Sequence, residues 1–281
     1  MNAPFIEVAW LAAHRNDPHV RIVDTRSTPH GAVVAMPSGA EQFAAGHIPG
    51  ALHLDYATDV HDPATPYAAR VAPPERFADV MAAGGIGDET FVVAYDDGTA
   101  PYAARMVWML QYYGHDGAAV LAGGLPAWTA AGHPLTQARA THARATFTPR
   151  VRPELRASRE EALAVAEGRS RAQFVDTQRD GTYALRDRDY AGAVRISGDA
   201  LLEDARGGRI AERTTLQRLV TEAGLDPHVR TIVACGSGVG ASGAFYALRE
   251  AGFTDVGVYD GSWMEWSHDE LPTVAKAIPR P

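Results

Sequence analysis

The chain has 281 residues, of which 46% are hydrophobic and 21% are charged, and its formal net charge is -8. This length exceeds the usual size of one compact domain, so we expect two domains with separate cores. The negative net charge argues against a binder of nucleic acid or anionic membranes, because either partner attracts a positive surface. The single cysteine, Cys235, excludes an internal disulfide bond.

The beginning of the chain lacks the basic segment and apolar run that form a secretory signal. No later stretch approaches the roughly 20 apolar residues that a membrane-spanning helix requires. We therefore expect a cytoplasmic protein without a membrane span, in which Cys235 remains a free thiol.

The two halves of the chain share a series of sequence features in the same order. An apolar strand that runs into polar residues is predicted at 20–26 and again at 172–178. Three further pairs follow, namely residues 50–54 with 192–196, 91–95 with 230–234, and 122–128 with 260–266. Four matches in one order indicate a duplicated domain.

Helical patterns lie between these matched segments. We predict helices at 103–113 and 243–251, because each pattern stops at a glycine, Gly114 or Gly252. Short apolar strands that alternate with helices are typical of an α/β domain with a mainly parallel sheet. Each half is therefore predicted to form one such domain.

A segment near the middle of the chain mixes proline, threonine, arginine and small residues without apolar periodicity. Such a composition favours a connection between domains. We therefore predict an N-terminal domain at 1–135, a linker at 136–153 and a C-terminal domain at 154–281.

Cys235 follows an apolar strand and begins a glycine-rich loop that leads into the helix of the second half. Backbone N–H groups in such a loop can converge on an anion at the start of a helix. These dipoles favour the thiolate, which is the nucleophilic form of cysteine. The pattern indicates a reactive thiol, although a free cysteine at a strand end is often only a small buried apolar residue.

A second alternative is a phosphatase with the spacing Cys-x5-Arg. That site would require arginine at position 241, where this chain has Ala241. Without a guanidinium at this position, no side chain would clamp the phosphoryl oxygens in a bidentate way. The sequence therefore argues against a phosphatase.

Three motifs resemble those of the two-domain rhodanese family. The run from Cys235 to Val239, Cys-Gly-Ser-Gly-Val, resembles the active-site loop of the mercaptopyruvate sulfurtransferases of that family. Residues 46–51 resemble the family signature of the first domain, and residues 259–266 resemble its C-terminal signature. The resemblance runs from about Phe5 to Leu271 and implies tandem rhodanese-like domains, each a mainly parallel sheet flanked by helices.

The resemblance implies a sulfurtransferase in which the Cys235 thiolate takes sulfur from a small donor and passes it on from a persulfide. The acceptor is a thiol or cyanide, a thioredoxin-like reductant is a further candidate partner, and neither a metal nor an organic cofactor is implied. Asp96 stands at the cysteine position of the first half, so that half is expected to be non-catalytic. Ser237 is the predicted auxiliary catalytic residue. The predicted substrate-binding residues are Gly236, Gly238, Val239, Gly240, Ala241, Arg179 and Arg186.

The loop and its surroundings point to different sulfur donors. Gly236 and Ser237 stand where members that prefer thiosulfate carry basic residues, which favours 3-mercaptopyruvate. Gln178 and Thr182, however, occupy the places of the arginines that bind the mercaptopyruvate carboxylate in the family. Thiosulfate, or persulfide delivered by a partner protein to a carrier, therefore remains an alternative.

The family also brings an aspartate and a histidine from the first domain toward the substrate, and this chain departs from that pattern. Ala57 and Ala69 stand at the matching places, with Asp55, Asp59 and His61 as neighbours that could substitute. We expect His47, in the first-domain signature, to be a hydrogen-bonding core residue rather than a catalytic one.

Overall fold

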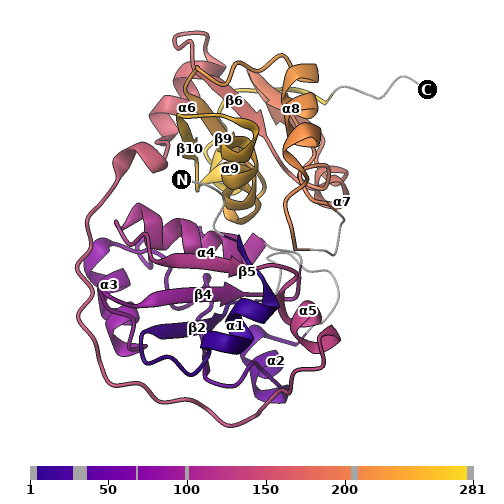
Figure 1. The fold of residues 1–281 in the computed structure, drawn as a ribbon. Helices are drawn as coiled ribbons and strands as arrows, with labels where there is room; N and C mark the ends of the chain where they lie inside the picture. The colour runs from indigo at the N-terminus through magenta and orange to yellow at the C-terminus, as the bar shows by residue number, and fades with distance from the viewer. Residues whose placement is uncertain (1–4, 28–36, 68, 99–100, 204–207, 277–281) are drawn as a thin grey trace. The chain divides into compact units, whose positions relative to one another are not determined.

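A computed structural model describes residues 5–27, 37–67, 69–98, 101–203 and 208–276. The chain divides into two compact units, which Figure 1 shows in indigo to magenta and in pink to yellow. Among the described residues, the first unit comprises 5–152 with 208–209, and the second comprises 153–203 and 210–276.

The first unit contains a five-stranded parallel sheet in the order β1-β5-β4-β2-β3. The strands are β1 (Phe5–Ile6), β2 (Val20–Asp24), β3 (Ala51–His53), β4 (Phe91–Tyr95) and β5 (Ala118–Leu121). The helices are α1 (Val8–His14), α2 (Gly39–Ala45), α3 (Pro74–Ala83), α4 (Pro101–Tyr112) and α5 (Gly124–Ala130). The central strands β2 and β4 are almost entirely buried, as parallel strands covered on both faces should be.

The second unit contains a four-stranded parallel sheet in the order β10-β9-β6-β8. Its strands are β6 (Gln173–Asp176), β8 (Ala193–Arg195), β9 (Thr231–Ala234) and β10 (Val256–Val258), and β7 (Arg188–Tyr190) pairs antiparallel with β11 (Thr273–Ala275). The helical segments are η1 (Pro153–Leu155), α6 (Arg159–Ala166), α7 (Asp180–Tyr183), α8 (Arg213–Glu222), α9 (Val239–Ala251) and α10 (Ser262–His268).

The two sheets confirm the predicted fold class, tandem α/β domains with parallel sheets flanked by helices. The order β5-β4-β2-β3 in the first unit matches β10-β9-β6-β8 in the second, strand for strand. The predicted helix at 103–113 is α4, and the helix predicted at 243–251 is α9, which already starts at Val239. Gly240 and Gly243 have low helix propensity, but α9 still starts at Val239, because the helix buries Val239 and Ala241.

The cores of the two units repeat the same tryptophan contact. Trp128 and Trp266 are buried, and their indole N–H groups donate to the carbonyl oxygens of Pro134 at 3.0 Å and Pro272 at 2.8 Å. His47 is fully buried, and its two ring nitrogens lie within hydrogen-bond distance of backbone carbonyls. The contacts of His47 agree with its predicted role as a hydrogen-bonding core residue, and buried tryptophans commonly pair their N–H groups in this way.

The segment at 137–152 forms neither helix nor strand, and it is bound to the first unit along its length. The Thr148 N–H and hydroxyl groups both donate to the Asp88 carboxylate at 2.7 Å. The N–H of Arg152 donates to the carbonyl of Tyr112 at 2.8 Å. The connection is therefore held by hydrogen bonds rather than extended freely into solvent.

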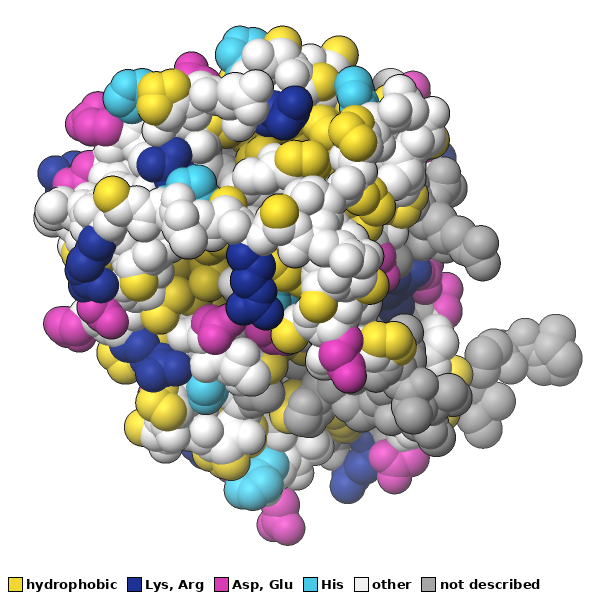
Figure 2. All heavy atoms as spheres, turned by 90° about the horizontal axis from the view of Figure 1, so that it is seen from below, with side chains coloured by type: hydrophobic (Ala, Val, Ile, Leu, Met, Phe, Trp, Pro, Cys, Tyr) yellow, Lys and Arg dark blue, Asp and Glu magenta, His cyan; other side chains and the backbone are white. Residues whose placement is uncertain are grey.

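The described part of the chain contains no helix that is both long and apolar enough to span a membrane. Across these same residues, no group of three side chains that could hold a metal ion is found. On the face that Figure 2 shows, positive and negative side chains of the described residues alternate, and hydrophobic side chains lie between them.

Candidate active site

Cys235 directly follows β9, a central strand of the second sheet, at the carboxyl end of the parallel strands. Crevices at this end of an open α/β sheet are the usual place for ligands. The next three residues form the loop to α9, and the thiol is largely buried, with 5% of the residue exposed. The strand and the loop thus fix where the sulfur lies.

The loop is tight because Gly238 adopts a left-handed conformation, with φ of 84°. A Cβ atom at Gly238 would lie 2.4 Å from the carbonyl oxygen of Asp260, so the position requires glycine. This conformation turns the Gly238 N–H toward Cys235, and it donates to Sγ at 3.2 Å. At Gly240 a Cβ atom would lie 3.5 Å from the sulfur, so glycine leaves that space open.

Beside the Gly238 N–H, which reaches the sulfur, the loop and the start of α9 carry further backbone donors. In the described part of the chain, no acceptor takes a hydrogen bond from the N–H groups of Gly236, Ser237, Val239 or Gly240. Unpaired N–H groups at a helix N-terminus attract negative charge. A thiolate or a persulfide on Cys235 is an anion of the kind that such a loop stabilises.

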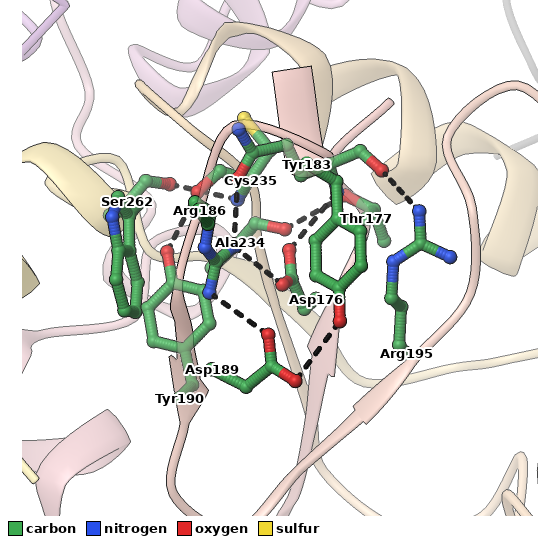
Figure 3. Close-up of polar contacts among 12 residues, drawn as sticks. Asp176, Thr177, Tyr183, Arg186, Asp189, Tyr190, Arg195, Ala234, Cys235 and Ser262 are labelled. Carbon is green, nitrogen blue, oxygen red and sulfur yellow. Dashed lines mark hydrogen bonds and ion pairs between the residues drawn. The ribbon is translucent and has the colours of Figure 1, made fainter. Parts of the chain in front are cut away.

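Both main-chain polar groups of Cys235, its N–H and its carbonyl, are hydrogen-bonded, as Figure 3 shows. Its N–H donates to the Ser262 hydroxyl at 3.1 Å, and that hydroxyl donates to the Tyr259 carbonyl at 2.8 Å. Its carbonyl accepts from the Tyr190 hydroxyl at 2.7 Å and from the Trp263 N–H at 3.1 Å. The backbone of the residue is therefore saturated, while the loop N–H groups beside the sulfur are not.

Arg186 is buried, with 5% of its side chain exposed. Its Nη1 donates at 2.7 Å both to the Asp176 carboxylate and to the side-chain oxygen of Gln178. The guanidinium carbon lies 3.6 Å from the ring centroid of Trp263. Burial raises the pKa of the Asp176 carboxyl above its ordinary value, and the Arg186 cation opposes this rise.

The other predicted donor-binding arginine, Arg179, is more accessible than Arg186. Its Nε donates to the Asp199 carboxylate, and 36% of its side chain is exposed. Gln178 lies against the loop, since a Cβ atom at Gly236 would be 3.4 Å from its side-chain nitrogen. The structure thus brings Gln178 to the cysteine loop and pairs both arginines with carboxylates of their own unit.

The corresponding loop of the first unit carries Asp96 at the end of β4. The buried Asp96 carboxylate accepts the N–H of Gly98 at 2.9 Å and the N–H of Ala103 at 3.1 Å. A carboxylate of the chain itself therefore takes up donors of this loop and of the helix that follows.

Three of the other first-domain candidates, Asp55, Ala57 and Asp59, lie in one hydrogen-bonded turn. The Asp55 N–H donates to the Asp59 carboxylate, and the Ala57 N–H donates to the Asp55 carboxylate, both at 2.8 Å. Asp55 also accepts from the Ser27 hydroxyl at 2.9 Å. These acids hold the backbone of their own turn.

Sequence reasoning missed Tyr190 and Ser262 as contacts of Cys235. A comparison of the two halves of the repeat could have identified both residues. Aligning the halves puts Ile48 at the position of Tyr190 and Gly124 at the position of Ser262. Each substitution adds a hydroxyl group in the half that contains the cysteine.

The comparisons with known proteins agree with this fold. The model of the rhodanese-like domain matches residues 7–131 and 160–269. The 3-mercaptopyruvate sulfurtransferase of Escherichia coli is 30% identical over 280 residues, which cover 95% of this chain and 96% of that protein. The thiosulfate sulfurtransferase of Gallus gallus is 31% identical, covering 83% of this chain and 82% of its own.

Solved structures show the same two-domain arrangement of elements. The crystal structure of SseA from Escherichia coli superimposes with a TM-score of 0.83 at 27% identity, covering 93% of this chain and 99% of that one. The 3-mercaptopyruvate sulfurtransferase from Leishmania major has a TM-score of 0.79 at 23% identity, covering 96% and 75% of the two chains.

The chain therefore belongs to the rhodanese family, with two rhodanese-like domains. It is a sulfurtransferase, an enzyme that moves sulfur from a donor to an acceptor. The family, the fold and the class of enzyme predicted from the sequence are thereby confirmed.

Proposed function

We propose that Cys235 is the nucleophile of this sulfurtransferase and carries the transferred sulfur as a persulfide. The observation that carries the proposal is the single thiol of the chain, placed at the carboxyl end of β9 within a loop of unpaired N–H groups. Residues 154–281 then form the catalytic domain. Residues 1–135 form the non-catalytic one with Asp96 in place of the cysteine, and 136–153 is the linker.

The first half-reaction transfers sulfur from the donor to the enzyme. With 3-mercaptopyruvate, the Cys235 thiolate attacks the donor sulfur, an S–S bond forms, and the C–S bond breaks. The electron pair of the broken bond leaves on the enolate of pyruvate, which then takes a proton. The half-buried Ser237 hydroxyl, two residues from the sulfur, is the group we assign to this proton transfer.

The second half-reaction returns the thiolate. An acceptor thiolate or cyanide attacks the outer sulfur of the persulfide, and the S–S bond breaks with its electron pair left on Cys235. The loop from Gly236 to Ala241 stabilises the negative sulfur at both stages. A thioredoxin-like dithiol is a protein acceptor compatible with this chemistry, since its second thiol releases the sulfur as sulfide.

We favour 3-mercaptopyruvate as the donor because the loop presents backbone donors and a hydroxyl but no cationic side chain. Thiosulfate carries two negative charges and needs more positive charge around it. Arg179, whose side chain is partly exposed, is the cation we assign to the donor carboxylate, and Arg186 supports the site from the core. The similar identities to relatives named for each donor keep thiosulfate as the second candidate.

A persulfide carrier that receives sulfur from a partner protein is the third candidate. This candidate is supported by the two predicted donor-binding arginines, which already bind carboxylates of the chain: Arg179 pairs with Asp199, and Arg186 pairs with Asp176. We also propose a cytoplasmic location, because a lone reactive thiol persists in a reducing compartment.

Steady-state kinetics with 3-mercaptopyruvate and with thiosulfate, combined with intact-mass analysis, test these proposals. We expect a higher kcat/KM for 3-mercaptopyruvate and a gain of about 32 Da, one sulfur atom, on the wild type after donor treatment. Cys235→Ser should show neither transfer nor the mass gain. A higher kcat/KM for thiosulfate would reverse the order of donors, and retained transfer in Cys235→Ser would overturn the proposed nucleophile.

A further inference from the structure

Two side-chain hydroxyls hold the main chain of Cys235, one at its N–H and the other at its carbonyl. The Ser262 hydroxyl accepts the Cys235 N–H at 3.1 Å, and the Tyr190 hydroxyl donates to the Cys235 carbonyl at 2.7 Å. Ser262 is fully buried and Tyr190 is 1% exposed, so water does not compete for either bond. We call these two residues the hydroxyl clamp.

Ser262 adopts a backbone conformation that favours glycine. Its φ is +48°, and the first half has Gly124 at the matching position with φ of +56°. A side chain in this left-handed region is strained, and such strain persists where the surrounding structure or a function requires the residue. The hydroxyl of Ser262 explains why serine replaces glycine at this position, because it accepts the hydrogen bond from the Cys235 N–H.

Tyr190 occupies the position of Ile48 in the first half, so the repeat supplies an apolar residue where the second half has a hydroxyl. Its ring is fixed by edge contacts with Phe174, Trp263 and Trp266, at centroid distances of 4.9 to 5.2 Å. Burial raises the pKa of Tyr190 well above its ordinary value, so the hydroxyl keeps its proton and remains a donor. The ring contacts hold the hydroxyl in place, and its retained proton makes it the donor in the hydrogen bond to Cys235.

We propose that Ser262 and Tyr190 are positioning residues that fix the Cys235 backbone so that its sulfur stays against the N–H groups at the start of α9. The inference rests on the proposed role of Cys235 as the nucleophile. The clamp satisfies the Cys235 N–H through Ser262 and the Cys235 carbonyl through Tyr190, so this carbonyl takes no donor from the loop. The Gly238 N–H already donates to the sulfur, and the other N–H groups of the loop remain available to the thiolate and to the persulfide. Preorganised donors of this kind favour the charged states of the reaction.

The test uses Ser262→Gly and Tyr190→Phe, each compared with a matched control. Glu270→Gly relieves the same backbone conformation, with φ of +53°, at an exposed residue. Tyr259→Phe removes a tyrosine hydroxyl from the same core, where it donates to Glu265 at 2.6 Å instead of to Cys235. The first control measures the effect of removing a strained backbone conformation, and the second measures the effect of losing a buried hydroxyl. Neither removes a hydrogen bond to Cys235.

Three measurements are made on the full chain: the single-turnover rate of persulfide formation, the alkylation rate of the thiol by iodoacetamide against pH, and Tm. We expect Ser262→Gly and Tyr190→Phe each to lower the single-turnover rate about tenfold, the effect of one lost buried hydrogen bond. Both should also shift the pH profile of alkylation. In Ser262→Gly these two changes should occur without a loss of Tm, because relief of the strained backbone conformation of Ser262 offsets the lost hydrogen bond.

The controls should keep both the transfer rate and the alkylation profile of the wild type. Clamp variants with wild-type rates and profiles would overturn the proposal, as would a Tyr259→Phe variant that loses as much transfer as Tyr190→Phe. Alkylation requires no sulfur donor, so the clamp remains testable even if Cys235→Ser were to retain transfer and disprove the nucleophile. The two failures are therefore distinguishable.

Discussion

The loops at Asp96 and Cys235 share a backbone framework but differ in chemistry. In each half a threonine hydroxyl donates to the carbonyl that ends the strand, Thr25 to Tyr95 and Thr177 to Ala234, both at 2.9 Å. In each half a backbone N–H near the start of a later helix, α5 or α10, donates to the carbonyl of the next residue, Leu125 to Asp96 at 2.9 Å and Trp263 to Cys235 at 3.1 Å.

The difference begins at the side chain that follows the strand. In the first half, the Asp96 carboxylate accepts the N–H groups of Gly98 and Ala103, so the chain supplies its own anion. In the second half, the Gly238 N–H is the one donor among the described residues that bonds the thiol of Cys235. The same fold thus closes its anion site with a carboxylate in one half and leaves it open to a sulfur anion in the other.

The largest effect is expected where the second half holds its own buried ion pair. Arg186→Gln removes the cation from Asp176, and loss of one partner of a buried pair costs about 3–5 kcal/mol of unfolding free energy. Burial already raises the pKa of Asp176 above its ordinary value, so this carboxyl favours folding when protonated and opposes it as the pH rises. The variant should therefore lose more stability at neutral pH than near pH 4, about the ordinary pKa of Asp.

Denaturant unfolding at several pH values measures this loss, and Arg188→Gln, at an exposed arginine, is the control. An Arg186→Gln variant with wild-type stability and a raised KM would instead make Arg186 a ligand of the donor. That result would place a cation in the open loop and weaken the comparison with the first half.

The loop glycine gives the next prediction. Gly238→Ala places a Cβ atom 2.4 Å from a backbone oxygen in a left-handed conformation, so we expect a loss of about 2–3 kcal/mol and a large fall in transfer. At Gly243, inside α9, an added Cβ atom meets no atom within 4 Å, so Gly243→Ala should stabilise the protein by up to about 1 kcal/mol. Thermal unfolding and transfer rates of the two variants test whether the loop conformation is required. Equal behaviour would show that the loop shape is not needed.

In the first half, Asp96→Ala should affect stability rather than sulfur transfer. The substitution leaves one N–H of the loop and one of α4 without their carboxylate, and we expect a loss of about 1–3 kcal/mol. Transfer per folded molecule should stay within about twofold of wild type, because the chemistry needs the other loop. Urea unfolding and single-turnover assays measure both quantities. A strong fall in transfer would contradict the non-catalytic assignment of this half.

The smallest effect is expected at the pair that anchors the connecting segment. Arg152 contacts both carboxylate oxygens of Asp116 at 2.6 and 2.7 Å, but the Asp116 side chain is 56% exposed. Solvent screening limits the loss in Asp116→Asn to at most about 1 kcal/mol.

The pH dependence of this pair has the opposite sign from that of Asp176. The hydrogen bond from Arg152 lowers the pKa of Asp116, so its stabilisation is present above the ordinary pKa and disappears as the pH falls through the lowered one. Tm differences between wild type and Asp116→Asn should therefore shrink in acid, with Glu89→Gln as an exposed control. A difference that grows in acid would contradict this account.

The sequence by itself determined the duplicated α/β domains and the place of Cys235 at the end of a strand. These features depend on apolar runs, glycines and a repeat, which are local patterns that the chain carries wherever it folds. The family motifs around Cys235 and Trp266 likewise lie within short continuous segments.

Only the tertiary structure decided which groups meet the cysteine backbone and what the arginines contact. The hydroxyls of Tyr190 and Ser262 come from residues 45 and 27 positions away from Cys235. The sequence predicted Arg186 to bind the donor, and the structure adds a buried contact with Asp176 that no local spacing reveals. Such contacts depend on how β6, β7, β9 and α10 pack together, because strand pairing and core packing join segments that no sequence period relates.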